Sequence, residues 1–451
     1  MALPAKKLRT QSYLHQFTEA LETGGLLDVR RQLDSLPPAD VAHLIESSPP
    51  RMRDVIWDLI EVEREGEILQ YLSDDLQVQF LSQMDAEEVV SVTEGLDADD
   101  IADVLQQLPD RVLRQVLDSM DAQDRHRLET VLSYPEDTAG GLMNPDAVTV
   151  RPRITLDAVL RYLRRHEALP DMTDAIIVVN RDDQFVGLLP VAKVLVSDPN
   201  LTVRDVMQTD IEPIPATMPA PEVAKLFERR DWVSAPVVNE AGRLLGRITI
   251  DDVVDVIIEQ ADHNVMSRAG LSEDADTFAP VWRAATKRAP WLGVNLLTTF
   301  IAAGVIGLFA DTIEQVVALA VLMPIIPSMG GVAGSQTLTL VIRGVALGHI
   351  GGANVRWLLG REVLVGLING LFWAVAVALV ATFWFNDPTL GVIAGAAMVF
   401  NLLAAPFAGA MLPIVLRAMR IDPALAGTVI LTTVTDVVGF VAFLGLATWV
   451  Y

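Results

Sequence analysis

Five long apolar stretches occupy the last third of the chain. They run over residues 291–310, 316–342, 363–385, 389–416 and 423–451. A helix needs roughly 20 apolar residues to cross the hydrocarbon core of a bilayer. The pattern therefore predicts an α-helical membrane domain of five transmembrane helices over residues 291–451.

Lys and Arg residues are unevenly distributed among the loops that join these helices. The loops before the first helix, after the second and after the fourth carry Lys287, Arg288, Arg343, Arg356, Arg361, Arg417 and Arg420. The alternate loops and the C-terminal tail carry none. Because basic loops stay on the cytoplasmic side, we expect a multi-pass protein of the inner (cell) membrane, with its N-terminus cytoplasmic and its C-terminus outside. The first thirty residues hold no long apolar run, so no cleavable signal peptide is expected.

The N-terminal residues show apolar positions at helical spacing in short segments. Leu36–Ile45 resembles Leu96–Leu105, and each segment has a Pro or Asp start before its apolar positions. Such internal similarity is typical of stacked helix pairs. We therefore expect an all-α helical-repeat domain over residues 1–133.

A second repeat follows the helical one. Asn180 matches Asn239, and Gly187 matches Gly246, with 59 residues between the members of each pair. Each copy reads as strand, turn, strand and helix, preceded by an earlier helix. The sequence thus predicts a tandem α/β module over residues 134–261, joined by a connecting helix over 262–290 to the membrane domain.

The composition narrows the classes of function. The net charge is −24, and the residues before 287 carry a net charge of −25. A strongly acidic body repels nucleic acid and concentrates cations, so nucleic acid is not an expected partner. The absence of cysteine excludes disulfides and thiolate metal sites, which leaves hard, oxygen-bound metals. There is no phosphate-binding P-loop and no cysteine nucleophile, so we do not expect an enzyme.

The second and fifth apolar stretches contain polar and helix-breaking residues. Pro324 and Pro327 interrupt the second stretch, and Asp436 lies near the middle of the fifth. A carboxylate at the bilayer centre costs about 2.5–3.5 kcal/mol on insertion scales, so we expect it to face an ion path. A structural Asp and close packing through small residues are the alternatives. The other candidates for the ion path are Thr432, Thr433, Gln336, Gly330, Gly331 and Asn401.

One carboxylate among hydroxyl groups suits a hydrated divalent cation. Mg2+ keeps several waters and uses one or two carboxylates. This argument does not separate Mg2+ from Mn2+, Co2+ or Ca2+.

Acidic residues also gather at two places before the membrane domain. One run contains Asp97, Asp99, Asp100 and Asp103, and a later series has helical spacing. Like charges on one helix face destabilise it, so a cation is a natural counterpart, although a solvated face is the usual explanation. The candidate regulatory metal ligands are Asp97, Asp100, Asp251, Asp252, Asp255, Glu259 and Asp262.

The second α/β copy contains the sequence GRITIDD, which matches a signature of cystathionine-β-synthase (CBS) modules through Gly246, Ile248, Thr249 and Asp252. The tandem module therefore resembles a CBS pair. The resemblance implies that Thr249 and Asp252 contact the ribose and phosphate of an adenine nucleotide such as ATP. The first copy departs from the signature, with Pro190 and Lys193 at the matching places, so at most one half-site is intact.

The whole chain resembles the MgtE family of Mg2+ transporters and channels. The resemblance rests on YPEDTAGGLM from Tyr134, GGVAGSQ from Gly330, DPAL from Asp422 and TTVTDVVGF from Thr432. It implies a homodimer with an Mg2+ pore that contains Asp436, and closure of that pore by Mg2+ on the acidic domains. The chain departs from the family pattern at Val332 and at Gly427–Thr428–Val429, which puts the ion contacts and the selectivity in question. A transporter of another divalent cation (Co2+ or Mn2+) and a non-conducting CBS membrane sensor remain the competing interpretations.

Overall fold

The computed structural model describes residues 26–93, 96–106, 108–166, 168–272, 275–347, 349–351 and 354–451. The chain divides into two compact units. We call Met1–Asp262 with Asp274–Pro280 the first unit, and His263–Glu273 with Val281–Tyr451 the membrane unit. The segment just before the first apolar helix thus belongs to the same body as the described helices of the N-terminal part.

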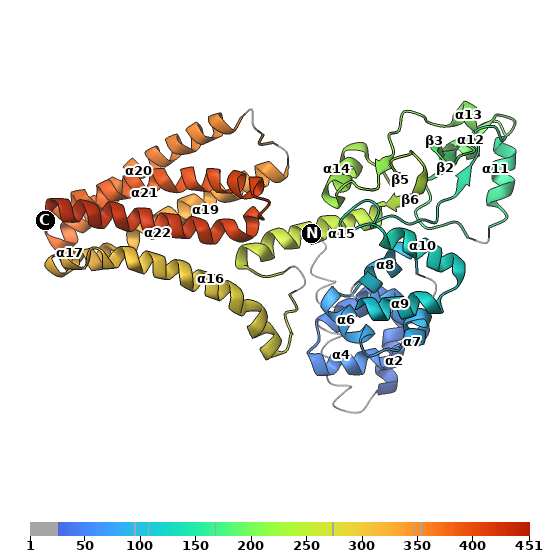
Figure 1. Cartoon of the computed structure of the whole chain (residues 1–451), viewed down its shortest axis with the longest axis horizontal. Coiled ribbons are helices and arrows are strands. Elements are labelled where there is room, and N and C mark those ends of the chain that lie inside the picture. The colour runs from blue at the N-terminus through green and yellow to red at the C-terminus, as the bar shows by residue number, and fades with distance from the viewer. Residues whose placement is uncertain are drawn as a thin grey trace. The chain divides into compact units, whose positions relative to one another are not determined.

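Short stacked helices form the N-terminal part of the first unit (Figure 1). Proline begins α3 and α4, and Asp121 caps α10 by accepting hydrogen bonds from two backbone N–H groups. The apolar faces of the helices bury a shared core that includes Ile45 and Leu69. The expected all-α domain is confirmed. Its helices are α2 (Leu26–Ser35), α3 (Pro38–Glu46), α4 (Pro50–Trp57), α5 (Val62–Leu69), α6 (Asp74–Leu81), α7 (Ala86–Thr93), α8 (Ala98–Gln106), α9 (Asp110–Ser119) and α10 (Ala122–Leu132).

Two small sheets of identical topology follow, which confirms the tandem α/β module. In each sheet the first strand is parallel to the second, and the second is antiparallel to the third. The strands are β1 (Thr149–Val150), β2 (Ala175–Val179), β3 (Phe185–Pro190), β4 (Ile214–Pro215), β5 (Ser234–Val238) and β6 (Leu244–Thr249). The accompanying helices are α11 (Leu156–Leu163), α12 (Val191–Val196), α13 (Val203–Val206) and α14 (Ala220–Arg230).

The residues that revealed this repeat have equivalent roles in the two copies. The side chains of Asn180 and Asn239 each accept backbone hydrogen bonds that hold the turn between two strands. A Cβ atom at Gly187 would lie 2.3 Å from the carbonyl oxygen of Gln208, and one at Gly246 would lie 2.4 Å from that of Asn144. Both glycines are therefore required by a close approach of another backbone segment.

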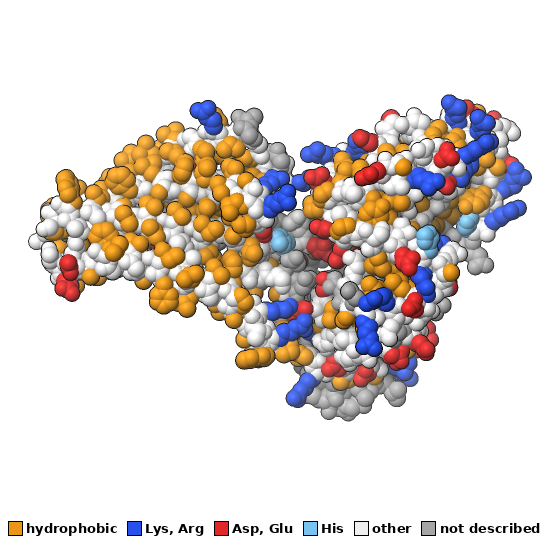
Figure 2. Space-filling model, in the orientation of Figure 1, with side chains coloured by type: hydrophobic (Ala, Val, Ile, Leu, Met, Phe, Trp, Pro, Cys, Tyr) orange, Lys and Arg blue, Asp and Glu red, His pale blue; other side chains and the backbone are white. Residues whose placement is uncertain are grey.

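The membrane unit is built from long apolar helices. Within the described residues, five helical segments are long and apolar enough to cross a membrane. Apolar side chains cover much of the visible face of this unit (Figure 2), as a lipid-facing surface requires. Its helices are α16 (Val281–Gly307), α17 (Ala310–Gln315), α18 (Ala318–Leu322), α19 (Ile325–Ala346), α20 (Val355–Phe385), α21 (Pro388–Ala418) and α22 (Pro423–Val450).

Two helix boundaries differ from the pattern of the sequence. The first membrane helix begins at Val281, ten residues before the expected apolar stretch, and continues through Pro290. The second apolar stretch is divided between α18 and α19 at Met323–Pro324, since proline lacks the backbone donor that would continue the helix. A helix α15 (Ile250–Met266) and a short 3-10 turn η1 (Ser267–Ala269) precede this unit's long helices in sequence.

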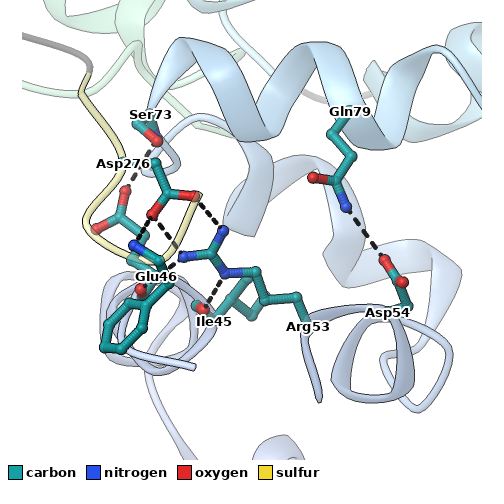
Figure 3. A network of polar contacts seen from close by, with 8 residues as sticks. Ile45, Glu46, Arg53, Asp54, Ser73, Gln79 and Asp276 are labelled. Atoms are coloured by element: carbon teal, nitrogen blue, oxygen red, sulfur yellow. Dashed lines mark hydrogen bonds and ion pairs between the residues drawn. The ribbon is translucent and has the colours of Figure 1, made fainter. Parts of the chain in front are cut away.

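A buried ion pair fixes the segment that leads into α16. The guanidinium of Arg53, on α4, is 1% exposed and donates to both carboxylate oxygens of Asp276, at 2.6 and 2.8 Å. The same guanidinium donates to the carbonyl oxygens of Ile45 and Glu46, at 3.1 and 3.0 Å (Figure 3). Asp276 in turn accepts from the backbone N–H of Phe278. We call this arrangement the Arg53 clasp.

The Arg53 clasp is saturated with hydrogen bonds, which is the condition under which a buried ion pair is stable. Removing one partner of such a pair leaves an uncompensated buried charge and costs about 3–5 kcal/mol. The clasp joins residues 223 positions apart in the sequence. Residues 275–280 are thus attached to the N-terminal helices by a specific contact.

We expect Arg53→Gln to release residues 275–280, because the amide can neither neutralise Asp276 nor bridge both of its oxygens. Hydrogen exchange of the Phe278 amide should become at least about tenfold faster in the intact protein. Arg30→Gln is the matched control, since Arg30 pairs with Glu61 on the surface, where ion pairs contribute little. Equal exchange in the two variants would contradict a structural role for the clasp.

Candidate functional site

An open cavity of about 920 Å3 lies in the membrane unit and is lined by residues of α19 and α22. Four of the residues predicted for the ion path line it: Gly331, Gln336, Thr432 and Asp436. The structure adds further polar positions, from both helices, that were not among the candidates chosen for the ion path. These are Ser328, Ser335, Thr339 and Thr435.

Asp436 supplies the only formal charge among the described residues that line the cavity. Within that same part of the chain, no group donates a hydrogen bond to its carboxylate. The nearby threonines use their hydroxyl protons within α22: Thr432 donates to the carbonyl oxygens of Thr428 and Val429, and Thr435 to that of Thr432. Their oxygens can therefore accept hydrogen bonds from water but do not neutralise the acid. Such an acid beside acceptor oxygens suits a cation that keeps its water shell.

Three predicted ion-path residues lie outside the cavity lining. Asn401 on α21 is fully buried, and its side-chain amide donates to the carbonyl oxygen of Ile326 at 2.7 Å. Gly330 packs against this amide, since a Cβ atom there would lie 2.3 Å from Asn401 Nδ2. Thr433 donates to the carbonyl oxygen of Val429. Gly330 of α19 and Asn401 of α21 thus pack against one another where the two helices meet.

The first unit contains a second group of functional candidates, which we call the acidic cluster. It combines Asp97, Asp99, Asp100 and Asp103, in and just before α8, with Asp251, Asp252, Asp255 and Glu259 of α15. Asp262, the remaining predicted ligand, is exposed and does not contribute to the pKa shifts of this cluster. Asp99 and Asp103 were visible in the acidic run but were not selected from the sequence as ligands.

Burial and mutual repulsion make the ionised form of the acidic cluster unfavourable. Burial raises the pKa of Asp103 to about 8, and the carboxylates of Glu136 and Asp100 add to this shift. Burial, with Asp251 next, raises the pKa of Asp252 to about 7. Burial also raises the pKa of Asp100 to about 6, with Asp97 contributing next. These carboxyls therefore need either protons or cations when α8 packs near α15.

Two side chains of the acidic cluster have an unused acceptor. The Oδ1 atoms of Asp99 and Asp103 are buried and have no hydrogen-bond partner among the described residues. Within the same part of the chain, no group of three acidic or histidine side chains is close enough to hold a metal ion directly. A cation would have to act through its waters or draw the carboxylates together.

The predicted nucleotide half-site is held by internal hydrogen bonds. The Thr249 hydroxyl donates to Asp252 Oδ2 at 2.9 Å and also contacts Asp251. The backbone N–H of Thr249 donates to the same Asp252 oxygen. Nearby Arg247 is 4% exposed, and its Nε and Nη1 atoms have no hydrogen-bond partner among the described residues. The Arg247 guanidinium could therefore attract the phosphates of a nucleotide. The hydrogen bond between Thr249 and Asp252 would have to break before both side chains could contact that nucleotide.

A pH dependence follows from the raised pKa values. Free carboxyls ionise near pH 4, whereas in the packed cluster the pKa values of Asp100, Asp252 and Asp103 are raised to about 6, 7 and 8. A raised pKa contributes stability that is complete below the free value and is lost as the pH rises through the packed value. Without divalent cations, packing of α8 near α15 should therefore weaken from pH 6 to 8.

Hydrogen exchange of α8 and of the start of α15, corrected for intrinsic rates, measures this packing. We expect protection to fall across that pH range in chelator and to be restored at pH 8 by millimolar Mg2+. Protection that is independent of pH would show that these carboxyls do not oppose one another in the folded protein.

Comparison with known proteins gives matches along most of the chain. Residues 323–446 match a family described as divalent cation transporter, residues 36–137 match the MgtE intracellular N domain, and residues 139–197 and 203–259 match the CBS domain. The solved cytosolic domain of the Mg2+ channel MgtE in complex with ATP is 32% identical, with a TM-score of 0.50 over 54% of this chain and 99% of that one.

Two curated relatives match over nearly their full length. The magnesium transporter MgtE of Bacillus subtilis is 29% identical over 95% of both chains. The magnesium transporter MgtE of Thermus thermophilus is 31% identical over 95% of this chain and 96% of its own. Together with the helical N domain, the CBS pair and the multi-pass membrane unit, these matches show that the chain belongs to the MgtE family of magnesium transporters.

Proposed function

We propose that the protein is a channel-like transporter that lets Mg2+ enter the cell down its electrochemical gradient, and that Mg2+ on the acidic cluster closes it. The observation that carries the transport proposal is Asp436, a carboxylate without a partner among the described residues, in a cavity otherwise lined by hydroxyl, amide and apolar groups. Such a cavity binds a hydrated cation weakly enough to release it, which conduction requires.

The driving force is available without an energy-coupling domain. Two inward positive charges gain about 4.6 kcal/mol per 100 mV of membrane potential. The distribution of Lys and Arg between the loops supports a cytoplasmic first unit in the inner membrane. The soluble acidic body would then sample the Mg2+ concentration that transport raises, which is the arrangement that feedback needs.

Closure would follow from the repulsion within the acidic cluster. Mg2+ that neutralises these carboxylates favours the packed state of α8 and α15, so it shifts the population toward that state. The Arg53 clasp attaches residues 275–280 to the same body, and α16 begins immediately after them. A change in the packing of the first unit would therefore be transmitted along the chain to the first membrane helix.

Two further parts of the proposal concern partners. The cavity is open and is lined by only two helices of the chain among the described residues, so a second copy would complete its wall and the protein would act as a homodimer. ATP would bind at Thr249 and Asp252 of the second CBS module. The ATP complex of the related cytosolic domain supports this assignment.

Mg2+ entry into proteoliposomes loaded with a Mg2+-sensitive dye tests transport and closure together. Wild-type protein should conduct at low Mg2+ on the side of the first unit and should conduct at least about tenfold less at high Mg2+ there. Asp436→Asn should lose most of the flux at low Mg2+, because the amide cannot offset the charge of the ion.

The matched control for Asp436→Asn is Asp311→Asn, which removes an exposed acid away from the cavity and should retain the flux. Competition with Co2+ and Mn2+ in the same assay identifies the preferred ion. Folded wild-type protein that conducts no ion at low Mg2+ would contradict transport and favour a non-conducting CBS sensor. Flux that ignores Mg2+ on the side of the first unit would contradict the proposed closure.

A further inference from the structure

A buried carboxylate lies behind the pore-lining helix. Glu362 on α20 is 4% exposed, and both of its carboxylate oxygens are engaged. Thr337 of α19 donates its hydroxyl to Oε2 at 2.9 Å, and Arg361 donates Nη1 to Oε1 at 2.8 Å. Arg361 is half exposed, so it can neutralise the acid while its guanidinium remains solvated. The cost of placing an acid in this span is therefore reduced by a specific partner for each oxygen.

Thr337 lies on the face of α19 that is turned away from the cavity. At 3.6 residues per turn, Ser335 lies about 160° from Thr337 around the helix axis. Ser335 and Gln336 line the cavity, and Thr337 does not. The hydrogen bond to Glu362 therefore holds the back of the helix whose front contributes to the proposed ion path.

A second polar contact holds the same face of α19. The side-chain amide of Asn401 donates to the carbonyl oxygen of Ile326. Ile326 and Thr337 are eleven residues apart, which places them within about 20° of one another around the helix. The two contacts lie near the two ends of the cavity-lining stretch and both come from behind it. Together they define the orientation of α19 about its own axis.

The other contacts behind α19 combine small residues with buried apolar side chains, among them Ile326 and Val341. A Cβ atom at Gly409 of α21 would lie 2.5 Å from the carbonyl oxygen of Gly334, so the two backbones touch. Close contacts of this kind hold helices together by surface fit. Apolar packing tolerates a small rotation of a helix more readily than a hydrogen bond does, because a hydrogen bond weakens steeply with angle. The polar contacts are therefore the contacts on this face that depend most strongly on the rotation of α19.

We propose that Glu362 is a positioning residue for ion transport, which through Thr337 fixes the rotation of α19 and keeps Ser335 and Gln336 turned toward the cavity that contains Asp436. The inference rests on the proposed transport function, but its structural content can be tested without flux. Glu362 itself does not line the cavity, so its effect on the ion is indirect.

Cysteine labelling tests the rotation directly, because the natural chain contains no cysteine. The variant Ser335→Cys in the intact protein should react with a small hydrophilic thiol reagent through the cavity. Adding Thr337→Val removes the donor at nearly constant volume and should slow the labelling by on the order of tenfold, as expected for loss of a hydrogen bond to a charged group. Adding Thr337→Ser, which retains the hydroxyl, should leave the rate unchanged.

Thr312→Val provides the matched control. Thr312 is also buried in the membrane unit and bonds another hydroxyl, that of Thr448, but it lies away from the cavity. Adding Thr312→Val to the Ser335→Cys variant should not alter the labelling of its thiol. Equal labelling rates with Thr337→Val and with Thr337→Ser would overturn the inference, as would an equal slowing by Thr312→Val.

The flux assay separates positioning from a general loss of stability. Thr337→Val should change the ratio of Mg2+ to Co2+ flux, whereas Thr337→Ser and Glu362→Gln, which keep a donor and an acceptor respectively, should preserve it. If Thr337→Val lowers the melting temperature but changes neither the ratio of Mg2+ to Co2+ flux nor the labelling rate, Glu362 contributes only to stability and does not position α19. Absence of flux in the wild type would contradict the proposed function, and the labelling rates would still decide the positioning role.

Discussion

Repulsion among the carboxylates of the acidic cluster is the constraint on which the first unit depends. Asp99, Asp103 and Asp252 lie where burial opposes ionisation, and their neighbours are further acids. At neutral pH the packed arrangement is stable only when protons or cations offset that charge. The packing of α8 near α15 therefore depends on whatever offsets this charge, and we propose that divalent cations do so. The Arg53 clasp joins the residues that precede α16 to the same unit.

The membrane unit uses charge sparingly and in two different ways. Asp436 lies in the cavity and has no partner within the described part of the chain, so it is available to an ion. Glu362 has a partner for each oxygen and lies behind α19, so it is not. Asn401 resembles Glu362 in this respect, since its amide is directed at backbone. Whether a polar group in the bilayer serves the ion or the helix therefore follows from its hydrogen bonds more than from its residue type.

The sequence predicted the fold class, the tandem repeat and Asp436 in a cavity, because long apolar runs, matched turn residues and a lone acid in such a run have few alternative explanations. It did not place the helix boundaries near residues 250–290, where α15 and α16 continue through charged residues and through Pro290. It predicted Asn401 and Gly330 for the ion path, and the structure places them against one another outside the cavity lining; the sequence does not show which face of a helix meets a neighbour. Glu362 and the Arg53 clasp were not recognised from the sequence because their partners are distant along the chain. Thr337 is 25 residues from Glu362, and Asp276 is 223 residues from Arg53.

The flux of Asp103→Asn at low Mg2+ tests most directly whether repulsion opens the protein. At nearly constant shape, the substitution replaces a carboxyl that must bind a proton or keep a buried charge when α8 packs, and it removes the repulsion from Glu136, Asp100 and Asp252. If repulsion drives opening, the variant should remain largely closed without Mg2+, with a flux well below that of the wild type in the same proteoliposomes. A flux equal to or above that of the wild type at low Mg2+ would contradict the account, and would mean that Asp103 acts, if at all, only as a ligand.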